Sequence, residues 1–222
     1  MKGVQILMYK HFFKRVIDIV SSFCGIMVLA VPMLIVAIII KIDSPGPVFF
    51  KQKRIAKGKK YFNIIKFRSM PVTVPRDTPT HQLQTAKVEL SKWQSFMRKA
   101  SIDELPQLFN ILGGSMSVIG PRPALWNQDD LIAERDKYGA NDVKPGLTGW
   151  AQINGRDELE IPVKARLDGE YVEALNAGGF KGFAMDVRCF FKTIVSVLRS
   201  DGVVEGGTGE IKKQEEKAEV GK

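Results

Sequence analysis

The chain has few of the side chains that build disulfide frameworks, zinc sites or histidine-based catalytic triads. Among its 222 residues only two are cysteine, Cys24 and Cys189, and only two are histidine, His11 and His81. Because Cys24 lies inside an apolar run, no disulfide framework is indicated, and a reducing compartment fits. A zinc site or a triad would have almost nothing to draw on. Any catalysis should therefore depend on carboxylates and bases.

Acidic residues are also in the minority. Lys and Arg number 33 against 24 Asp and Glu, and the sequence pI is about 9.5. This excess predicts a polyanionic partner, and composition does not choose among nucleic acid, acidic lipid headgroups and phosphorylated ligands. The apolar content of 45% is sufficient for a folded core, which excludes disorder of the whole chain.

Charged residues are missing from Ile19 to Ile40, a run flanked by Lys14 and Arg15 on one side and Lys41 on the other. About 20 apolar helical residues cross a bilayer core, and the run exceeds the roughly 7–15 residues of a signal peptide core. Pro32 removes a helical hydrogen bond within the run and predicts a kink. Cations flank both ends of the run, so the tendency of Lys and Arg to stay on the cytoplasmic side does not favour placing either end outside the cell. A helix that bends and returns to the same face satisfies both facts, although a single span with a tolerated proline is the commoner arrangement.

Turn-forming residues mark the domain boundaries. The Ser44-Pro45-Gly46-Pro47 stretch ends the apolar helix, so residues 1–43 are expected to form an N-terminal membrane helix and residues 44–205 a folded domain. Residues 206–222 consist mainly of Gly, Lys and Glu and are expected to form a disordered tail.

The folded domain is predicted to be α+β and mainly helical. Residues 48–55 and 61–67 predict two strands of a basic hairpin, and residues 71–87 an irregular surface loop. Residues 88–99 have the periodicity of a core-facing helix. Residues 180–198 predict a basic amphipathic helix, which lies in a membrane interface or covers a soluble core, the commoner case.

Two adjacent carboxylates, Asp103 and Glu104, precede a short apolar run that contains Pro106. Adjacent helical residues diverge by about 100°, so one carboxylate could attack a phosphorus atom while the other holds a metal or a proton. Ser101 with Glu104 also matches a capping box, and Asp103 could itself cap a helix. Without further context capping is the more frequent role. The two roles are compatible, because helix N-termini also bind phosphate.

Several cations lie in or beside turn-forming motifs. Flanking prolines fix the backbone around Arg122 in Gly120-Pro121-Arg122-Pro123, which suits bidentate phosphate recognition or a stiff turn with a solvated Arg. Lys66, Arg68 and Arg156 lie near other turns. Taken singly, each is most often a surface charge.

Six motifs follow one another between Lys14 and Asp201. They are Lys14-Arg15 with Asp18, Pro45-Gly46-Pro47-Val48-Phe49-Phe50-Lys51-Gln52, Lys66-Phe67-Arg68-Ser69-Met70, Asp103-Glu104-Leu105-Pro106-Gln107-Leu108, Gly120-Pro121-Arg122-Pro123, and Lys144-Pro145-Gly146-Leu147-Thr148-Gly149-Trp150-Ala151-Gln152. In order and content they resemble the bacterial sugar transferases. These are monotopic phosphoglycosyl transferases that begin capsule, exopolysaccharide and glycoprotein glycan assembly on undecaprenyl phosphate.

The resemblance implies a re-entrant membrane helix broken at Pro32, in place of a span. It implies a small catalytic domain with a β-hairpin and amphipathic interfacial helices on the cytoplasmic face of the bacterial inner membrane. The implied reaction is a ping-pong transfer that uses Mg²⁺. Asp103 attacks the β-phosphorus of a UDP-sugar, UMP leaves, and undecaprenyl phosphate takes the phosphosugar, with Glu104 assisting through the metal.

The resemblance also implies further site residues. Lys66, Arg68, Arg98, Arg122 and Arg156 match basic positions near the substrate phosphates, and Asp168 matches an acidic position. Membrane lipid is an expected partner and nucleic acid is not. The Ala124-Leu125-Trp126-Asn127-Gln128 stretch resembles that of relatives that use N-acetylated amino sugars.

Two features depart from or limit the resemblance. Glu173–Phe180 differs from the Asn-Trp-Ser-like stretch of many relatives, and the chain matches the minimal form of the family, without a multi-span N-terminal part. Two other functions compete with the transfer of a sugar phosphate. A membrane-tethered binding module would release no nucleotide, and a glycosyltransferase that moves the sugar alone would release UDP in place of UMP.

Overall fold

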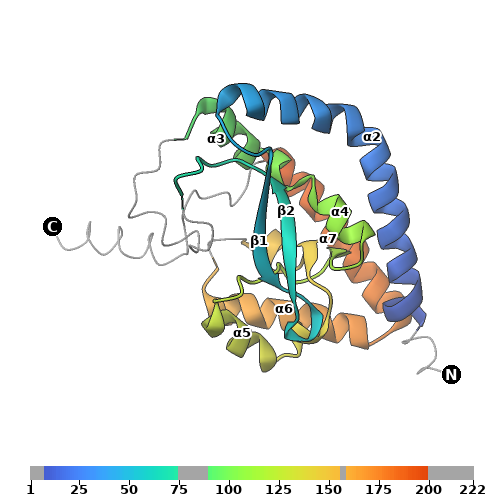
Figure 1. Ribbon diagram of the computed structural model, residues 1–222. Coiled ribbons are helices and arrows are strands. Elements are labelled where there is room, and N and C mark those ends of the chain that lie inside the picture. Colours follow the sequence, from blue (N-terminus) through green and yellow to red (C-terminus); the bar gives the residue numbers. More distant parts are fainter. Residues whose placement is uncertain (1–7, 75–89, 156–158, 200–222) are drawn as a thin grey trace.

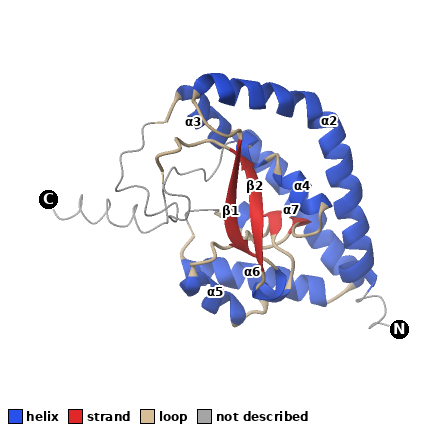
Figure 2. Cartoon of the chain, viewed as in Figure 1, coloured by secondary structure: helices blue, strands red, loops and turns tan. Residues whose placement is uncertain are grey.

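The computed structural model describes residues 8–74, 90–155 and 159–199. Figures 1 and 2 show a mainly helical fold around two small sheets, as the sequence predicts. The predicted tail, most of the predicted loop at 71–87 and Arg156 lie outside the described residues.

The N-terminal helix is continuous from η1 (Tyr9–Phe13) into α2 (Lys14–Asp43) and is long and apolar enough to cross a membrane. Figure 1 shows that α2 bends near its middle into two limbs that follow the edge of the molecule. Pro32 lies inside α2 and cannot donate a backbone hydrogen bond, which accounts for a bend there. Ser44 adopts an extended conformation and ends the helix.

The middle of α2 exposes large apolar side chains. Val28 is 76% exposed, Val31 66% and Leu34 61%. A core helix of a soluble domain would bury these residues, and a contiguous exposed apolar surface of this kind marks a membrane or partner contact. We conclude that the chain is a membrane protein.

The two limbs of α2 contact the folded domain through different chemistry. The first limb buries the polar residues Lys14, Asp18 and Ser22, which recur every four positions and so share one helix face. The second limb buries Met33, Val36 and Ile40, which pack with Phe67 and Met97. The helix is therefore attached at both ends while its middle stays exposed.

The polar end of α2 forms specific hydrogen bonds with the folded domain. Oδ1 of Asp18 accepts from Ser117 Oγ and from the backbone N–H of Val118, each at 2.9 Å. Arg15 donates to the backbone carbonyls of Ile111 and Leu112 at 2.7 and 2.9 Å. The Lys14-Arg15 and Asp18 motif therefore docks the membrane helix onto the domain.

Strands β1 (Phe49–Ile55) and β2 (Tyr61–Phe67) form an antiparallel hairpin in which Phe49 pairs with Phe67 and Ile55 with Tyr61. The turn contains the 3-10 segment η2 (Lys57–Lys59), where Gly58 has φ of 67°, a conformation that glycine adopts without strain. The sequence predicts this hairpin correctly, except that β1 begins one residue later.

A second sheet, which the sequence analysis did not predict, pairs β3 (Ser117–Ile119) in parallel with β4 (Gly146–Thr148). Gly146 and Gly120 lie so close that a Cβ on Gly146 would come within 3 Å of the Gly120 backbone. Side chains of either residue would separate the strands. Three-residue strands inside glycine- and proline-rich segments carry too few residues for a periodic pattern.

The helical part of the domain surrounds these sheets (Figure 1). Its helices are α3 (Lys92–Lys99), α4 (Gln107–Leu112), α5 (Asp129–Asp136), α6 (Ile161–Asn176) and α7 (Gly179–Arg199), and its 3-10 segments are η4 (Ile102–Glu104), η5 (Ala140–Asp142) and η6 (Gln152–Asn154). Helix α3 begins four residues later than predicted, because Ser91 and Gln94 form a capping box.

Helix α7 turns most of its predicted apolar face away from the core. Phe180, Phe191 and Val195 are 81%, 62% and 46% exposed, whereas Asp186 and Cys189 on another face are buried. Of the two arrangements that the sequence left open for this face, the exposure argues against coverage of a soluble core. The exposed face is of the kind that lies in a membrane interface.

Candidate active site

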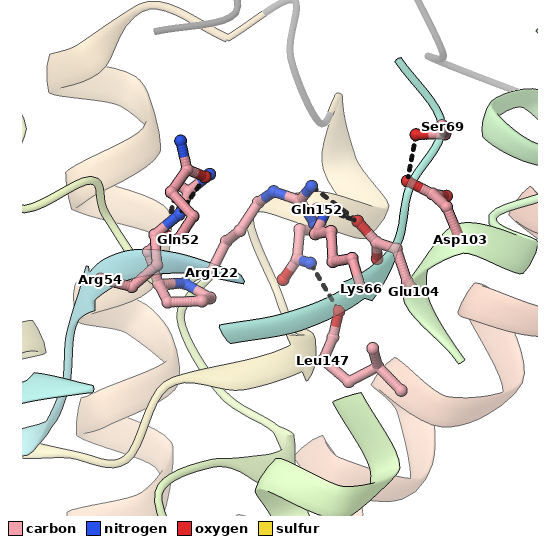
Figure 3. A network of polar contacts seen from close by, with 10 residues as sticks. Gln52, Arg54, Lys66, Ser69, Asp103, Glu104, Arg122, Leu147 and Gln152 are labelled. Atoms are coloured by element: carbon pink, nitrogen blue, oxygen red, sulfur yellow. Dashed lines mark hydrogen bonds and ion pairs between the residues drawn. The ribbon is translucent and has the colours of Figure 1, made fainter. Parts of the chain in front are cut away.

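Glu104 is the centre of a charged cluster at one end of the hairpin (Figure 3). Its Oε1 accepts from Nζ of Lys66 and from Nη2 of Arg122, each at 2.8 Å. Lys66 comes from β2, Glu104 from η4, and Arg122 from the loop after β3. Residues far apart in the sequence therefore meet at one point, as the resemblance implies for these three.

Asp103 lies beside this cluster but faces a different partner. Its Oδ2 accepts from Ser69 Oγ at 3.2 Å, and the residue is 7% exposed. Figure 3 shows the carboxylates of Asp103 and Glu104 directed toward different neighbours. The two side chains therefore diverge, as side chains of adjacent helical residues do, and their separate chemical roles stay a prediction.

The two carboxyl groups differ in acidity. Burial raises the pKa of Asp103 above its ordinary value, the positive charges of Lys66 and Arg98 offset part of this effect, and the charge of Glu104 adds to it. Burial would also raise the pKa of Glu104, but Arg122 and Lys66 outweigh burial and hold it well below its usual range. Glu104 is therefore a fixed anion, whereas Asp103 takes up a proton more readily.

The local backbone does not support a capping role for either carboxylate. Ser101 has φ of 54°, in the left-handed region, and its side chain makes no capping hydrogen bond. Helix α4 begins after Pro106 without a side-chain cap, and Asp103 and Glu104 bond to Ser69 and to cations instead. The capping-box prediction is wrong, and the capping box of this region is the one at the start of α3.

The backbone around Arg122 is held from both sides. The N–H of Gly120 donates to Thr148 O and that of Gly146 to Pro121 O, each at 2.8 Å. Arg135 donates to the carbonyl oxygen of Arg122 at 2.9 Å. The rigid presentation of Arg122 thus comes from the parallel strands and from Arg135, in addition to the flanking prolines.

Asp168 supports this arrangement from the interior. It is 1% exposed, and its Oδ2 accepts from Nε and Nη2 of Arg135 at 2.8 and 2.6 Å. The structure therefore gives Asp168 a positioning role, since it orients Arg135 and through it the backbone of Arg122. Direct contact of Asp168 with substrate stays a prediction.

The remaining predicted cations occupy different places. Arg68 donates to the backbone carbonyls of Ser44 and Pro45, where α2 ends, and is not part of the Glu104 cluster. Arg98 lies on α3, where its charge acts on Asp103 and its buried Nε has no hydrogen-bond acceptor among the described residues. Arg156 lies outside the described part of the chain.

The structure adds site residues that sequence reasoning did not single out. Ser69 contacts Asp103, and Gln152, at the start of η6, lies beside Arg122 and Lys66 in Figure 3. Nε2 of Gln152 donates to Leu147 O at 2.9 Å, while its buried Oε1 has no donor within the described ranges. Ser69 and Gln152 each fall inside a quoted motif, and this was the only sequence signal for them.

The donor set fits a magnesium ion. Residues 8–74, 90–155 and 159–199 contain no cluster of three or more His, Cys, Asp or Glu side chains. Mg²⁺, however, often binds one or two carboxylates together with substrate phosphates and waters. Oδ1 of Asp103 and Oε2 of Glu104 make no hydrogen bond with a described residue. Two hard anionic oxygens of the dyad are thus available to a cation.

Comparison with known proteins identifies related chains. A family model described as bacterial sugar transferase matches residues 9–200. An uncharacterized sugar transferase of Bacillus subtilis (strain 168), EpsL, is 37% identical over 190 residues, which cover 86% of this chain and 89% of the relative.

Two further relatives carry names that state an activity. The UDP-glucose:undecaprenyl-phosphate glucose-1-phosphate transferase of Xanthomonas campestris pv. campestris is 44% identical over 125 residues, 55% of this chain and 26% of the relative. The UDP-N-acetylgalactosamine-undecaprenyl-phosphate N-acetylgalactosaminephosphotransferase of Aeromonas hydrophila is 36% identical over 204 residues, 86% of this chain and 45% of the relative. The chain thus spans less than half the length of each of these two.

Proposed function

The chain belongs to the bacterial sugar transferase family, and from this premise we propose that it transfers a sugar 1-phosphate from a UDP-sugar to undecaprenyl phosphate, with release of UMP. As a member of this family it is a phosphoglycosyl transferase. The observation that carries the detailed mechanism is the buried Asp103–Glu104 pair, in which one carboxylate is bound by two cations and the other is left for chemistry.

In the first step Asp103 is the nucleophile. One of its carboxylate oxygens forms a bond to the β-phosphorus of the UDP-sugar, and the bond from that phosphorus to the oxygen bridging the two phosphates breaks. UMP leaves with the bridging oxygen, and the sugar phosphate remains on Asp103 as an acyl phosphate. Ser69, as a hydrogen-bond donor to Oδ2, orients the carboxylate for this attack.

In the second step the lipid regenerates the enzyme. A phosphate oxygen of undecaprenyl phosphate attacks the phosphorus of the acyl phosphate, the bond to Asp103 breaks, and a lipid-linked diphosphate sugar is formed. Phosphoryl transfer needs alignment of the reactants and neutralisation of charge on the phosphoryl oxygens. Lys66 and Arg122 supply fixed positive charge beside the dyad.

Asp103 and Glu104 would hold Mg²⁺ together with oxygens of the diphosphate, and the ion would neutralise charge on the phosphates and on the leaving UMP. Burial of Asp103 makes its anionic form costly, so a nearby cation would favour the reactive anion. Arg98, whose guanidinium acts on the same carboxylate, assists in the same sense.

The proposed location is the cytoplasmic face of the inner membrane, with α2 re-entrant. The bend in α2 and the docking of both its limbs onto one domain support a helix that enters and leaves on the same side. The exposed apolar face of α7 supports an interfacial position for the domain. Lipid phosphate and soluble nucleotide sugar would then meet at the membrane surface.

The test is nucleotide release by the full chain in micelles with undecaprenyl phosphate and Mg²⁺. UDP-glucose and UDP-N-acetylgalactosamine are the first donors to compare, because the two named relatives differ in this respect. UMP production that Asp103→Asn abolishes, and that the exposed control Asp136→Asn retains, supports the proposal. Release of UDP would indicate transfer of the sugar alone and would overturn the mechanism.

A further inference from the structure

A cavity of about 250 Å³ lies away from the Asp103–Glu104 site, at the other end of the parallel β3/β4 sheet. Ser117, the first residue of β3, lines this cavity, whereas Arg122 follows the last residue of the same strand. The cavity lies among the start of α2, the hairpin turn and the loop before β4. None of the Glu104 cluster lines it.

Half of the residues that line this basic cavity are Lys, Arg or His. Its basic residues are Lys10, His11, Lys14, Arg15, Lys57 and Lys144, against the two carboxylates Asp18 and Asp142. Asp18 is already bound through Oδ1 to the domain, and Lys14 is paired with Asp186 at 2.6 Å. The remaining cations therefore outnumber the carboxylates available to neutralise them.

Two of these cations have no partner among the residues that the structure describes. Neither Lys57 nor Lys144 makes a hydrogen bond or ion pair with another residue in the described ranges. Arg15 Nη2 and Lys144 Nζ lie 3.2 and 3.9 Å from the position that a Cβ on Gly114 would take, so these charges converge. The bonds of Arg15 go to neutral carbonyls and leave its charge uncompensated.

The electrostatics agree with this geometry. Burial lowers the pKa of Lys144, and the charges of Arg15, Lys57 and Lys14 lower it further, whereas Asp18 acts in the opposite sense. Partly buried ammonium groups that repel one another are stabilised when an anion binds between them. A phosphate group matches several convergent N–H donors of this kind.

The position of the cavity points to the source of that phosphate. Lys10, Lys14 and Arg15 stand at the start of the apolar helix, at the level where an inserting helix meets the headgroups. Phe12 and Phe13, beside them on the chain, are 60% and 45% exposed and would contact acyl chains. Basic residues at such a level attract anionic lipids.

We propose that the basic cavity binds the phosphate group of an anionic phospholipid headgroup, at a site separate from the one that binds the sugar nucleotide. The bound lipid bridges the start of α2, the hairpin turn and the loop before β4. Because the proposal concerns binding alone, it is testable whether or not the chain transfers a sugar phosphate.

The experiment measures ligand binding by the full chain in neutral detergent micelles. The probes are short-chain phosphatidylglycerol, short-chain phosphatidylcholine as the zwitterionic control, and inorganic phosphate. The test variant is Lys57→Gln with Lys144→Gln. The matched control, Lys60→Gln with Lys137→Gln, removes the same charge from exposed positions outside the cavity.

We expect phosphatidylglycerol to bind the wild type and the control alike, and the test variant at least about tenfold more weakly. Lys144→Arg should retain binding, which keeps the test valid if the double variant is poorly folded. Equal binding by wild type and test variant, or no binding of phosphatidylglycerol, would overturn the proposal. Inorganic phosphate that binds as tightly as phosphatidylglycerol would overturn the assignment to a lipid.

Discussion

Replacement of Asp103 by Asn should separate catalysis from stability. The amide keeps the size of the carboxyl group and an oxygen that accepts from Ser69, but it removes the attacking anion. The acyl phosphate on residue 103 should therefore no longer form. Turnover should fall at least about 10³-fold, which corresponds to roughly 4 kcal/mol in the activation barrier.

The same substitution should raise the stability of the folded protein at neutral pH, although it abolishes turnover. The pKa of Asp103 is raised in the folded state, so the folded protein binds this proton more tightly than the unfolded chain does. The free energy of unfolding therefore falls as pH rises from the ordinary carboxyl pKa of about 3.9 through the raised value. Each pKa unit of elevation corresponds to about 1.4 kcal/mol, and Asn removes this cost.

The assay compares unfolding of wild type and Asp103→Asn in micelles between pH 4 and pH 8. The variant should be the more stable protein at neutral pH, and the difference in the free energy of unfolding should be smaller near pH 4. Radiolabelled UDP-sugar without acceptor then tests for the intermediate in the same preparations. If the stability of Asp103→Asn relative to wild type falls between pH 4 and pH 8, the electrostatic reasoning is refuted. If Asp103→Asn still retains the radiolabel, Asp103 is not the nucleophile.

Three further predictions concern other parts of the chain. Asp168→Asn should cost about 3 kcal/mol of stability because it leaves buried Arg135 without its anion, and it should lower turnover through Arg122. Denaturation of Glu134→Gln, which breaks the surface ion pair with exposed Lys137, should show almost no effect. Cysteines introduced at positions 10 and 45 should react with an impermeant reagent from the same side of the membrane, and labelling from opposite sides would rule out the re-entrant helix. Truncation after Glu205 should leave UMP release within about tenfold of the full chain, since the Gly-, Lys- and Glu-rich tail has little to bury; a larger loss would contradict this.

The sequence predicted elements that carry a long periodic pattern or an unambiguous turn. The hairpin strands, the apolar helix with Pro32 and the amphipathic α7 each repeat one pattern over many residues. The β3/β4 sheet was missed because three residues per strand give no period. Periodicity left two surroundings open for the apolar face of α7, because it identifies a face but not the medium that contacts it.

The candidate site was predicted residue by residue through the resemblance, and its geometry required the fold. Lys66, Glu104 and Arg122 are separated by up to 56 positions, and nothing local in the sequence indicates that they share one ion-pair cluster. The structure also shows different contacts for residues to which the resemblance gave one shared role. Arg68 donates to the end of α2 and Asp168 accepts from Arg135, contacts that the sequence did not indicate, and the substrate contacts expected of both residues stay predictions.

The hydrogen bonds of Arg15 and Asp18 tie α2 to the elements that hold Glu104 and Arg122, so the helix does more than anchor the chain. Arg15 bonds to the end of α4, the helix that follows Glu104, and Asp18 bonds to β3, the strand that leads to Arg122. A foreign apolar helix grafted in place of residues 8–43 would bring the domain to the membrane but would supply neither bond. We expect such a chimera to sediment with membranes and yet show little turnover. Turnover should be restored only when Arg and Asp are placed at the equivalent positions of the grafted helix.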